Sequence, residues 1–185
     1  MRNETVLVVA ATRAEAAHVP AGLEVVVTGL GKTAAAVATT RALAGRDPAG
    51  LSVVNIGTAG ALRDGLAGLH LPGTVVNHDM NAEAVRALGY DPQELLTLPG
   101  GDDSVLASGD VFVSDPVVRE ALAARAHLVD MEGYAVAYAC LAMGVPVRLV
   151  KHVSDNADES ALDWPRMVDR SARALGAWLA SEYRR

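Results

Sequence analysis

Seven short runs rich in Val, Leu and Ile, set apart by stretches with helical patterns, limit what this chain can fold into more than any other feature. Several runs are continuously apolar, which is typical of strands covered on both faces. Strands that alternate with helices favour a parallel or mixed sheet with helices on both sides. The runs are TVLVVA (5–10), EVVVT (24–28), SVVNIG (52–57), GTVVN (73–77), SVLASGD (104–110), HLVDM (127–131) and VRLVKHVSD (147–155).

Four segments have the pattern of helices. One of them opens with Asp115 and Pro116, which supply an N-cap and a proline at the first helical position. The piece from Tyr90 to Asp103 is rich in Pro, Gly and Asp, so we expect a mobile loop there. The expected helices cover residues 32–44, 115–125 and 132–143, and a last one begins at 163–165.

The composition limits the core and the binding partners. With 185 residues we expect one domain, residues 1–185, that buries a sizeable core. Only 4% of the residues are aromatic although 51% are hydrophobic, so Ala, Val and Leu must build that core. A net charge of −6 without a block of Lys or Arg argues against a nucleic-acid surface.

The location of the protein is constrained by its cysteine count and its hydropathy. Cys140 is the only cysteine and cannot form an internal disulfide, which fits a reducing compartment. The N-terminal apolar run is too short for a signal peptide, and no stretch reaches 18 uncharged apolar residues. We therefore expect a soluble cytoplasmic protein without a membrane span.

Most of the unusual polar residues lie where the expected strands end. In open α/β sheets, ligands bind beyond the carboxyl ends of the strands, so we expect a site there. The six ends are Ala10–Glu15, Thr28–Lys32, Asn55–Gly60, Ser108–Val113, Asp130–Glu132 and Ser154–Asp158.

The glycine turn TGLGKTAAA (28–36) has the outline G-x-G-x-x-A between a strand and a helix, which is typical of dinucleotide-binding turns. Against this interpretation, it follows the second strand, and the next strand ends without an acid to hold a ribose. A P-loop is excluded because Val26 stands where glycine is required. A tight strand-to-helix turn explains the pattern more simply.

Four other positions each allow a structural and a functional interpretation. Thr58 lies in NIGTAGAL, which is either a close-packed turn or a ligand-binding one. Phe112 is the only Phe and would fill the core or stack on a planar ligand. Asp155 follows an apolar strand, which suits either a proton donor or a turn cap. Glu15 has, by spacing alone, the pattern of an ordinary exposed helix acid.

VDMEGYAVAYAC (129–140) places two carboxylates where an apolar strand meets a helix of small residues. The helix dipole alone explains an acid at this position. The alternative is that Glu132 faces a polar ligand, whereas Asp130 keeps the structural interpretation.

Metal and serine-hydrolase chemistry find no support in the sequence. The five histidines show no metal-binding spacing, and the lone cysteine has no paired ligand, so we expect no metal. A G-x-S-x-G motif is absent.

The order of the motifs is more specific than any one of them. GxGK, NxGxAG, SGDxF, VxMEGxAxAxxC and VSDxAD follow one another, and in this order the chain resembles the nucleoside phosphorylase/nucleosidase superfamily. Within it the chain looks most like the 5′-methylthioadenosine/S-adenosylhomocysteine nucleosidases, from about Val6 to Leu179. The resemblance implies a three-layer α/β sandwich around a twisted mixed sheet, a homodimer, and hydrolysis of the N-glycosidic bond of a purine nucleoside.

The resemblance also implies which residues carry the chemistry. Glu15 matches the acid that activates the attacking water, and Asp155 matches the acid that protonates purine N7. Ser154 would hold Asp155 in place. Because the leaving base needs a proton and the water needs a base, two carboxyl groups suffice and no cofactor is implied.

A second set of residues matches the substrate-binding positions of the family. Phe112 would stack on the base, the backbone of Val113 would contact the base edge, and Met131 would pack beneath the ribose. Glu132 would accept hydrogen bonds from the ribose hydroxyls. Thr58 falls near the ribose and the nucleophile, and Trp164 falls near the purine.

Water is favoured over phosphate as the nucleophile. The phosphorylases of the superfamily use arginines, one of them just before the G-S/T turn, where this chain has Asn55. Lys32, Arg63 and Lys151 are other cations that a phosphate could meet. A futalosine-type nucleosidase, a phosphorylase and a nucleoside-binding domain without turnover therefore stay open as alternatives.

The chain departs from the family pattern in three places. It is shorter between Tyr90 and Ser104, and ATRAEAA around Glu15 lacks the usual glycine and methionine. Lys151 stands where relatives often have Arg. These changes lie near the entrance and the 5′ side of the expected site, so they concern the substrate more than the reaction.

Overall fold

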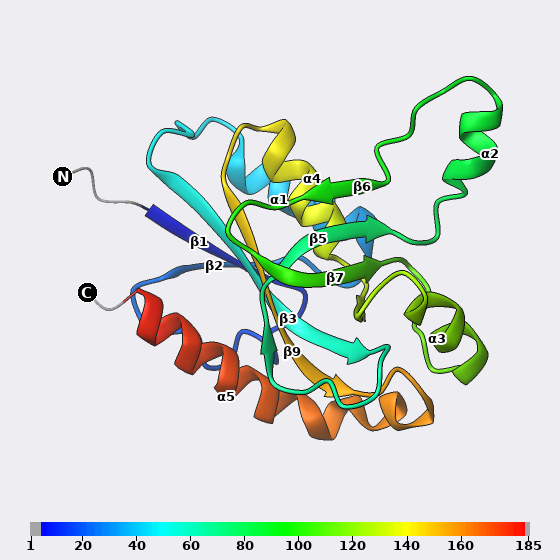
Figure 1. Cartoon of the computed structure of the whole chain (residues 1–185). Coiled ribbons are helices and arrows are strands. Elements are labelled where there is room, and N and C mark those ends of the chain that lie inside the picture. The colour runs from blue at the N-terminus through cyan, green and yellow to red at the C-terminus, as the bar shows by residue number, and fades with distance from the viewer. Residues whose placement is uncertain (1–4, 184–185) are drawn as a thin grey trace.

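The computed structural model describes residues 5–183 as one mixed sheet with helices on both faces (Figure 1). The strands are β1 (Thr5–Ala10), β2 (Glu24–Val27), β3 (Leu51–Ala61), β4 (Leu69–His70), β5 (Pro72–Asn77), β6 (Leu95–Thr97), β7 (Asp102–Ser108), β8 (Leu128–Asp130) and β9 (Val147–Asp155). The helices are α1 (Lys32–Leu43), α2 (Ala82–Ala87), α3 (Pro116–Ala123), α4 (Gly133–Ala142) and α5 (Trp164–Glu182), with a 3₁₀ turn η1 (Glu159–Asp163) before α5. This confirms the predicted fold class.

The long strand β3 organises the sheet. The strand order is β2-β1-β3-β8-β7-β5-β6, and β9 pairs with β3 and with β4. Strand β3 runs parallel to β1 and β9, but its end pairs antiparallel with β8. Gly60 there lies opposite both Val129 of β8 and Asp155 of β9. The end of β3 therefore brings together two segments in which the sequence predicts functional acids.

Side chains along β1 point alternately to the two faces of the sheet and pack into two hydrophobic cores, one on each face. Leu7 and Val9 join the core under α1 and α4, whereas Val6 and Val8 join the core under α5. Successive side chains of a strand point to opposite faces, so a continuously apolar run indicates cover on both sides. Figure 1 shows α1 and α4 on one side of the sheet and α5 on the other.

Helix α4 lies close to the sheet because its residues are small. A side chain at Gly133 would come within 2.7 Å of Leu106 Cδ2 and 3.0 Å of Asp130 Oδ2, so glycine lets the start of the helix pack here without displacing these side chains. At the start of α3, Asp115 accepts a hydrogen bond from the Val117 amide at 2.7 Å, which confirms the predicted N-cap.

The segment predicted as a mobile loop contains a short strand. Strand β6 pairs antiparallel with β5, and both Leu96 within it and Leu98 just after it are buried. Helix α2 and strand β4 were also not predicted, because two to six residues show no clear periodicity. Strand β3 extends beyond the predicted residues 52–57, since its glycine-rich end continues to pair with β9.

Among residues 5–183, no helix has both the length and the apolar character that a membrane crossing requires.

Candidate active site

One cleft, with a cavity volume of about 150 Å³, opens at the carboxyl ends of the strands, where open α/β sheets bind their ligands. All nine residues that the sequence singles out for catalysis or binding line it, although they come from six separate segments. They are Glu15, Thr58, Phe112, Val113, Met131, Glu132, Ser154, Asp155 and Trp164.

Glu15 is buried in the turn after β1 and is held by four hydrogen-bond donors. The amide and hydroxyl of Thr58 donate to Oε1 at 2.8 and 3.0 Å, and those of Thr12 donate to Oε2 at 3.1 and 3.0 Å. Trp164, at the start of α5, donates from Nε1 to the Thr58 hydroxyl at 2.8 Å. Glu15 is therefore not the exposed helix acid that its spacing alone indicates; its orientation is fixed from two strand ends.

Asp155 ends β9 and is fixed by two donors. Ser154 Oγ donates to Oδ2 at 2.6 Å, and the Ala157 amide donates to Oδ1 at 2.8 Å. The acid thus caps the following turn, as one of its two interpretations predicts, and it also lines the cleft; its role as a proton donor stays a prediction.

The turn after Asp155 has a strained backbone. Ala157 has a φ of 52°, which no other non-glycine residue shares among residues 5–183. A side chain at Gly60 would come within 2.8 Å of the Ala157 methyl group and 3.0 Å of Asp155 Oδ1. Glycine at position 60 is therefore needed for the acid to take up its place.

The two carboxylates around Met131 have different structural partners. Asp130 caps α4, because the Gly133 amide donates to its Oδ2 at 3.0 Å. Glu132 turns to the cleft, and its Oε1 accepts a hydrogen bond from the Gly31 amide at 2.7 Å. Burial, reinforced by the nearby Asp130 charge, raises the pKa of Glu132 to about 7.

Lys151 is a buried cation whose partner the sequence alone does not identify. Its ammonium forms an ion pair with Asp130 at 2.9 Å and donates to Asn55 Oδ1 at 2.7 Å. The signal was present in the sequence, because a lysine inside an apolar strand requires a buried acid. The partner could not be identified, since Asp130 belongs to another strand.

The mouth of the cleft is apolar. Phe112 is 49% exposed there, whereas Val113 is buried. Leu30 and Val111, which the sequence did not single out, also line the cleft. The ring of Phe112 is thus accessible to a planar ligand.

No group of three or more His, Cys, Asp or Glu side chains is placed to hold a metal ion within residues 5–183.

We expect Glu132→Gln to stabilise the folded protein at pH 8 but not at pH 4. The folded-state pKa of about 7 lies above the ordinary glutamate value of 4.5, so the folded state binds a proton more tightly than the unfolded state. Stability is therefore lost as the pH rises from about 4.5 through 7, and an uncharged Gln removes this loss, by up to about 3 kcal/mol. Calorimetric Tm values at both pH values test this, with the exposed Glu120→Gln as control. An equal Tm change at both pH values would contradict it.

Comparisons with known proteins relate this cleft to a protein family. A family model described as the phosphorylase superfamily matches residues 102–180. The 5′-methylthioadenosine/S-adenosylhomocysteine nucleosidase of Shewanella sp. (strain W3-18-1) is 30% identical over 179 residues, which span 80% of this chain and 75% of that protein. The aminodeoxyfutalosine nucleosidase of Helicobacter pylori (strain ATCC 700392 / 26695) is 30% identical over 129 residues, or 58% of this chain. This chain spans only 56% of the length of that relative.

The fold is shared with solved structures. A crystal structure of Helicobacter pylori 5′-methylthioadenosine/S-adenosylhomocysteine nucleosidase, complexed with a pyrrolopyrimidine-bearing pyrrolidinol, superposes with a TM-score of 0.84. The identity is 24%, and the superposition covers 98% of each chain. The likeness extends over the whole sheet and both helical layers.

Proposed function

The chain belongs to the phosphorylase superfamily, and from this premise we propose that it is a purine nucleosidase, which hydrolyses the N-glycosidic bond of a nucleoside and releases the free base. The observation that carries the proposal is the placement of Glu15, Glu132 and Asp155, each held by its own donors, around one cleft with an accessible aromatic ring at its mouth. Two relatives with names of this reaction type support it.

In the proposed mechanism Asp155, Glu15 and Glu132 each have a separate role. Asp155, positioned by Ser154, donates a proton to the purine, which then leaves as a neutral base. Glu15 orients a water and accepts its proton as the water attacks the sugar. Glu132 accepts hydrogen bonds from the ribose hydroxyls and orients the sugar between the other two acids.

Phosphate is disfavoured as the nucleophile because the candidate cations are engaged elsewhere. Lys151 is neutralised by Asp130 and shares a hydrogen bond with Asn55. Lys32 is bound by carboxylates at the rim, and Arg63 donates to a backbone carbonyl at the surface. No Lys or Arg is among the described residues that line the cleft. A phosphate dianion would find no partner there, so water is the better nucleophile.

The apolar mouth suits a 5′ substituent that begins with an apolar thioether group. Leu30, Val111 and Met131 lie along the cleft, and a thioether group would bury against them more favourably than a phosphate would. We therefore propose 5′-methylthioadenosine or S-adenosylhomocysteine as substrate. An aminofutalosine-type nucleoside is the second candidate, because the Helicobacter relative carries the name of that reaction.

A nucleoside panel tests the function. The purified protein is incubated with methylthioadenosine, adenosylhomocysteine, aminofutalosine, adenosine and inosine, with and without phosphate, and free base is measured. We expect base release without phosphate from at least one 5′-modified nucleoside. Release that requires phosphate would establish phosphorolysis instead, and binding without release would favour a non-catalytic nucleoside-binding domain.

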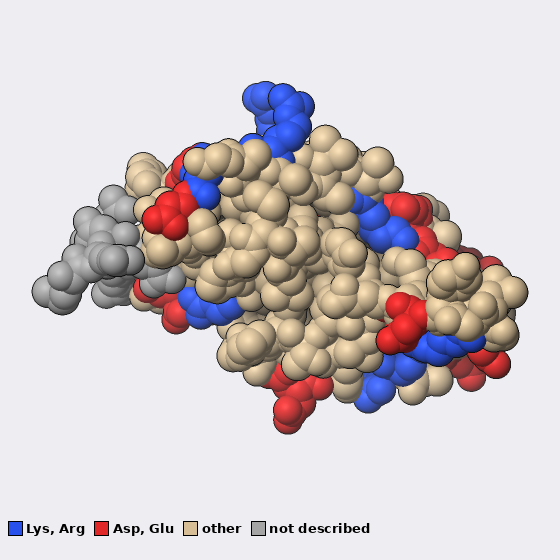
Figure 2. Space-filling view, turned by 90° about the horizontal axis from the view of Figure 1, so that it is seen from above, with Lys and Arg blue, Asp and Glu red and all other residues tan. Residues whose placement is uncertain are grey.

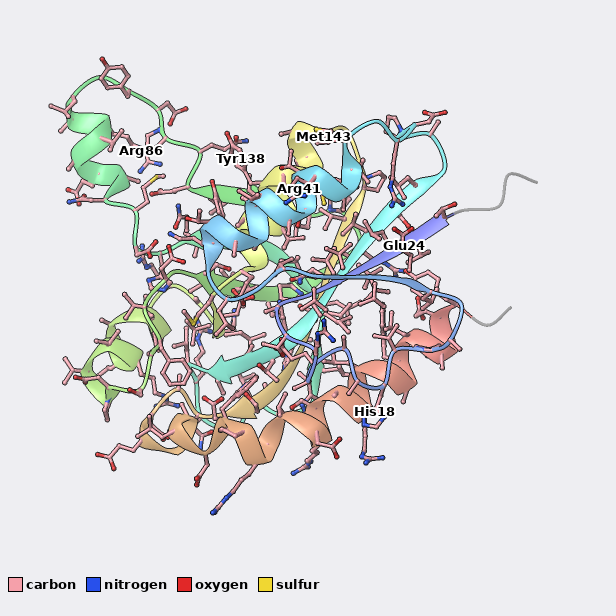
Figure 3. All side chains as sticks on the ribbon, turned by 180° about the vertical axis from the view of Figure 1, so that it is seen from behind. His18, Glu24, Arg41, Arg86, Tyr138 and Met143 are labelled. Atoms are coloured by element: carbon pink, nitrogen blue, oxygen red, sulfur yellow. The ribbon has the colours of Figure 1, made fainter. Side chains whose placement is uncertain are left out.

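We further propose a cytoplasmic homodimer formed through α1 and α4. Helix α4 is apolar around its whole circumference, yet Tyr138, Leu141 and Met143 are exposed, as is Val37 on α1. Figure 2 shows a broad uncharged area on this side, and Figure 3 places Tyr138 on α4, Arg41 on α1 and Met143 directly after α4. Light scattering after gel filtration should give twice the chain mass, and Tyr138→Glu should give a monomer. A wild-type monomer would contradict the proposal.

A further inference from the structure

The glycine turn between β2 and α1 does more than connect them. The Lys32 amide donates to Asp110 Oδ1 at 2.7 Å, and its ammonium donates to Asn77 Oδ1 at 2.7 Å and pairs with Asp79. The Asp110 amide in turn donates to Asp79 Oδ2 at 2.8 Å. The turn is thereby tied to the segments that follow β5 and β7.

The same turn contacts the carboxylate of Glu132. Gly31 donates its amide to Oε1 of Glu132 at 2.7 Å, across 101 residues of sequence. Gly31 has a φ of 88°, and a side chain on it would lie 3.0 Å from Asp110 Oδ1. The direction of this amide therefore depends on a backbone conformation that favours glycine and on the neighbouring aspartate.

We propose that the turn Gly29–Lys32 is a positioning device for the ribose-binding carboxylate, in which the Gly31 amide holds one oxygen of Glu132 and Lys32 fixes the turn. The inference rests on the proposed function of Glu132. Lys32 itself does not line the cleft, so it is a positioning residue rather than a catalytic one. One oxygen of Glu132 stays bound to the protein, and the other is left for a sugar hydroxyl.

The turn Gly29–Lys32 also connects Glu132, the proposed ribose-binding carboxylate, to the segment that holds Phe112, the proposed base-stacking ring. Asp110 directly precedes Val111 and Phe112, which line the mouth of the cleft. Removing the Lys32 charge would leave Asp79 and Asp110 facing each other without a cation, and their repulsion would move the turn. Both the sugar-binding carboxylate and the base-stacking ring would then lose their alignment.

The acidic limb of the pH profile of kcat/KM depends on the hydrogen bond between the Gly31 amide and Glu132. The charged groups around Glu132 are Asp130, Lys151 and Glu15, and the Gly31 hydrogen bond lowers its pKa against the effect of burial. Loss of that hydrogen bond raises the pKa of Glu132 further, so more alkaline conditions are needed to ionise it.

Lys32→Met tests the inference, with the nucleoside that the wild type cleaves fastest as substrate. We expect KM to rise about tenfold and the acidic limb of kcat/KM to move to higher pH. Lys32→Arg keeps the charge and should recover most of the affinity. Arg170→Met removes an exposed cation from α5, outside the proposed dimer face, and should change neither value.

Several results would overturn the inference. Lys32→Met with KM and acidic limb unchanged, even if its Tm falls, would show a structural role only. An equal rise of KM in Lys32→Met and Lys32→Arg would show that the positive charge at position 32 does not fix the turn. A crystal structure of Lys32→Met in which the Gly31 amide still contacts Glu132 would refute the positioning role of Lys32, independently of any activity measurement. A wild type that cleaves no nucleoside would instead refute the proposed function.

Discussion

Asp155→Asn is expected to lower the kcat of base release by about 10²–10⁴-fold while the protein stays folded. An amide of this size still accepts the hydrogen bond of the Ala157 amide, and the Ser154 hydroxyl can rotate to meet the new NH₂ group. It has no acidic proton to give to the leaving purine. Single-turnover measurement of free base separates this chemical step from product release. Asp163→Asn is the matched control, because Asp163 is exposed and makes no capping side-chain hydrogen bond.

A substrate that needs no protonation sharpens the test of Asp155. With p-nitrophenyl riboside the leaving group departs as a stable anion, so the effect of Asp155→Asn should shrink to a few-fold. If the variant lost equal activity on both substrates, Asp155 would act on the sugar or on binding rather than as the general acid.

Glu15→Gln is the second large effect, with kcat again lowered by about 10²–10⁴-fold. The native carboxylate accepts two hydrogen bonds on each oxygen, from Thr12 and from Thr58. A glutamine keeps one acceptor oxygen and turns a donor toward two other donors, so the side chain loses its basicity and part of its support. We expect a lower Tm together with the loss of kcat.

The lower Tm must be separated from the loss of chemistry. Calorimetric titration with a nucleoside analogue should give a Kd within a few-fold of wild type if the cleft persists. Glu83→Gln, on the exposed side of α2, controls for the loss of one charge. Near-normal turnover of Glu15→Gln would show that another group activates the water.

The sheet could be predicted because its strands are local patterns. Apolar runs such as TVLVVA carry enough periodic information to locate a buried strand, and the capped helix at Asp115 was equally local. The short strand at Leu96 was missed because three residues between Pro and Gly resemble a loop. This strand is stabilised by pairing with β5, and a contact between segments that are distant in the sequence leaves no local pattern.

The site was predicted at the level of residues but not of contacts. Strand ends indicated where Glu15, Glu132 and Asp155 would lie, since carboxyl ends of neighbouring strands share one edge of a sheet. The contact of Gly31 with Glu132 depends on how loops far apart in the chain pack, which a single sequence does not encode in a readable pattern. The strained Ala157 could not be foreseen either, because alanine is rarely found at a positive φ.

Each of the three acids that the proposed mechanism uses accepts a hydrogen bond from at least one main-chain amide. These amides belong to Thr12 and Thr58 for Glu15, to Ala157 for Asp155 and to Gly31 for Glu132. Substitutions that respect the backbone conformation change side chains but keep such donors, so the sequence around the acids can drift during evolution while their geometry is inherited. The segment ATRAEAA around Glu15 illustrates this: one of the amides that hold the acid belongs to Thr12, and a substitution of the Thr12 side chain would keep that amide.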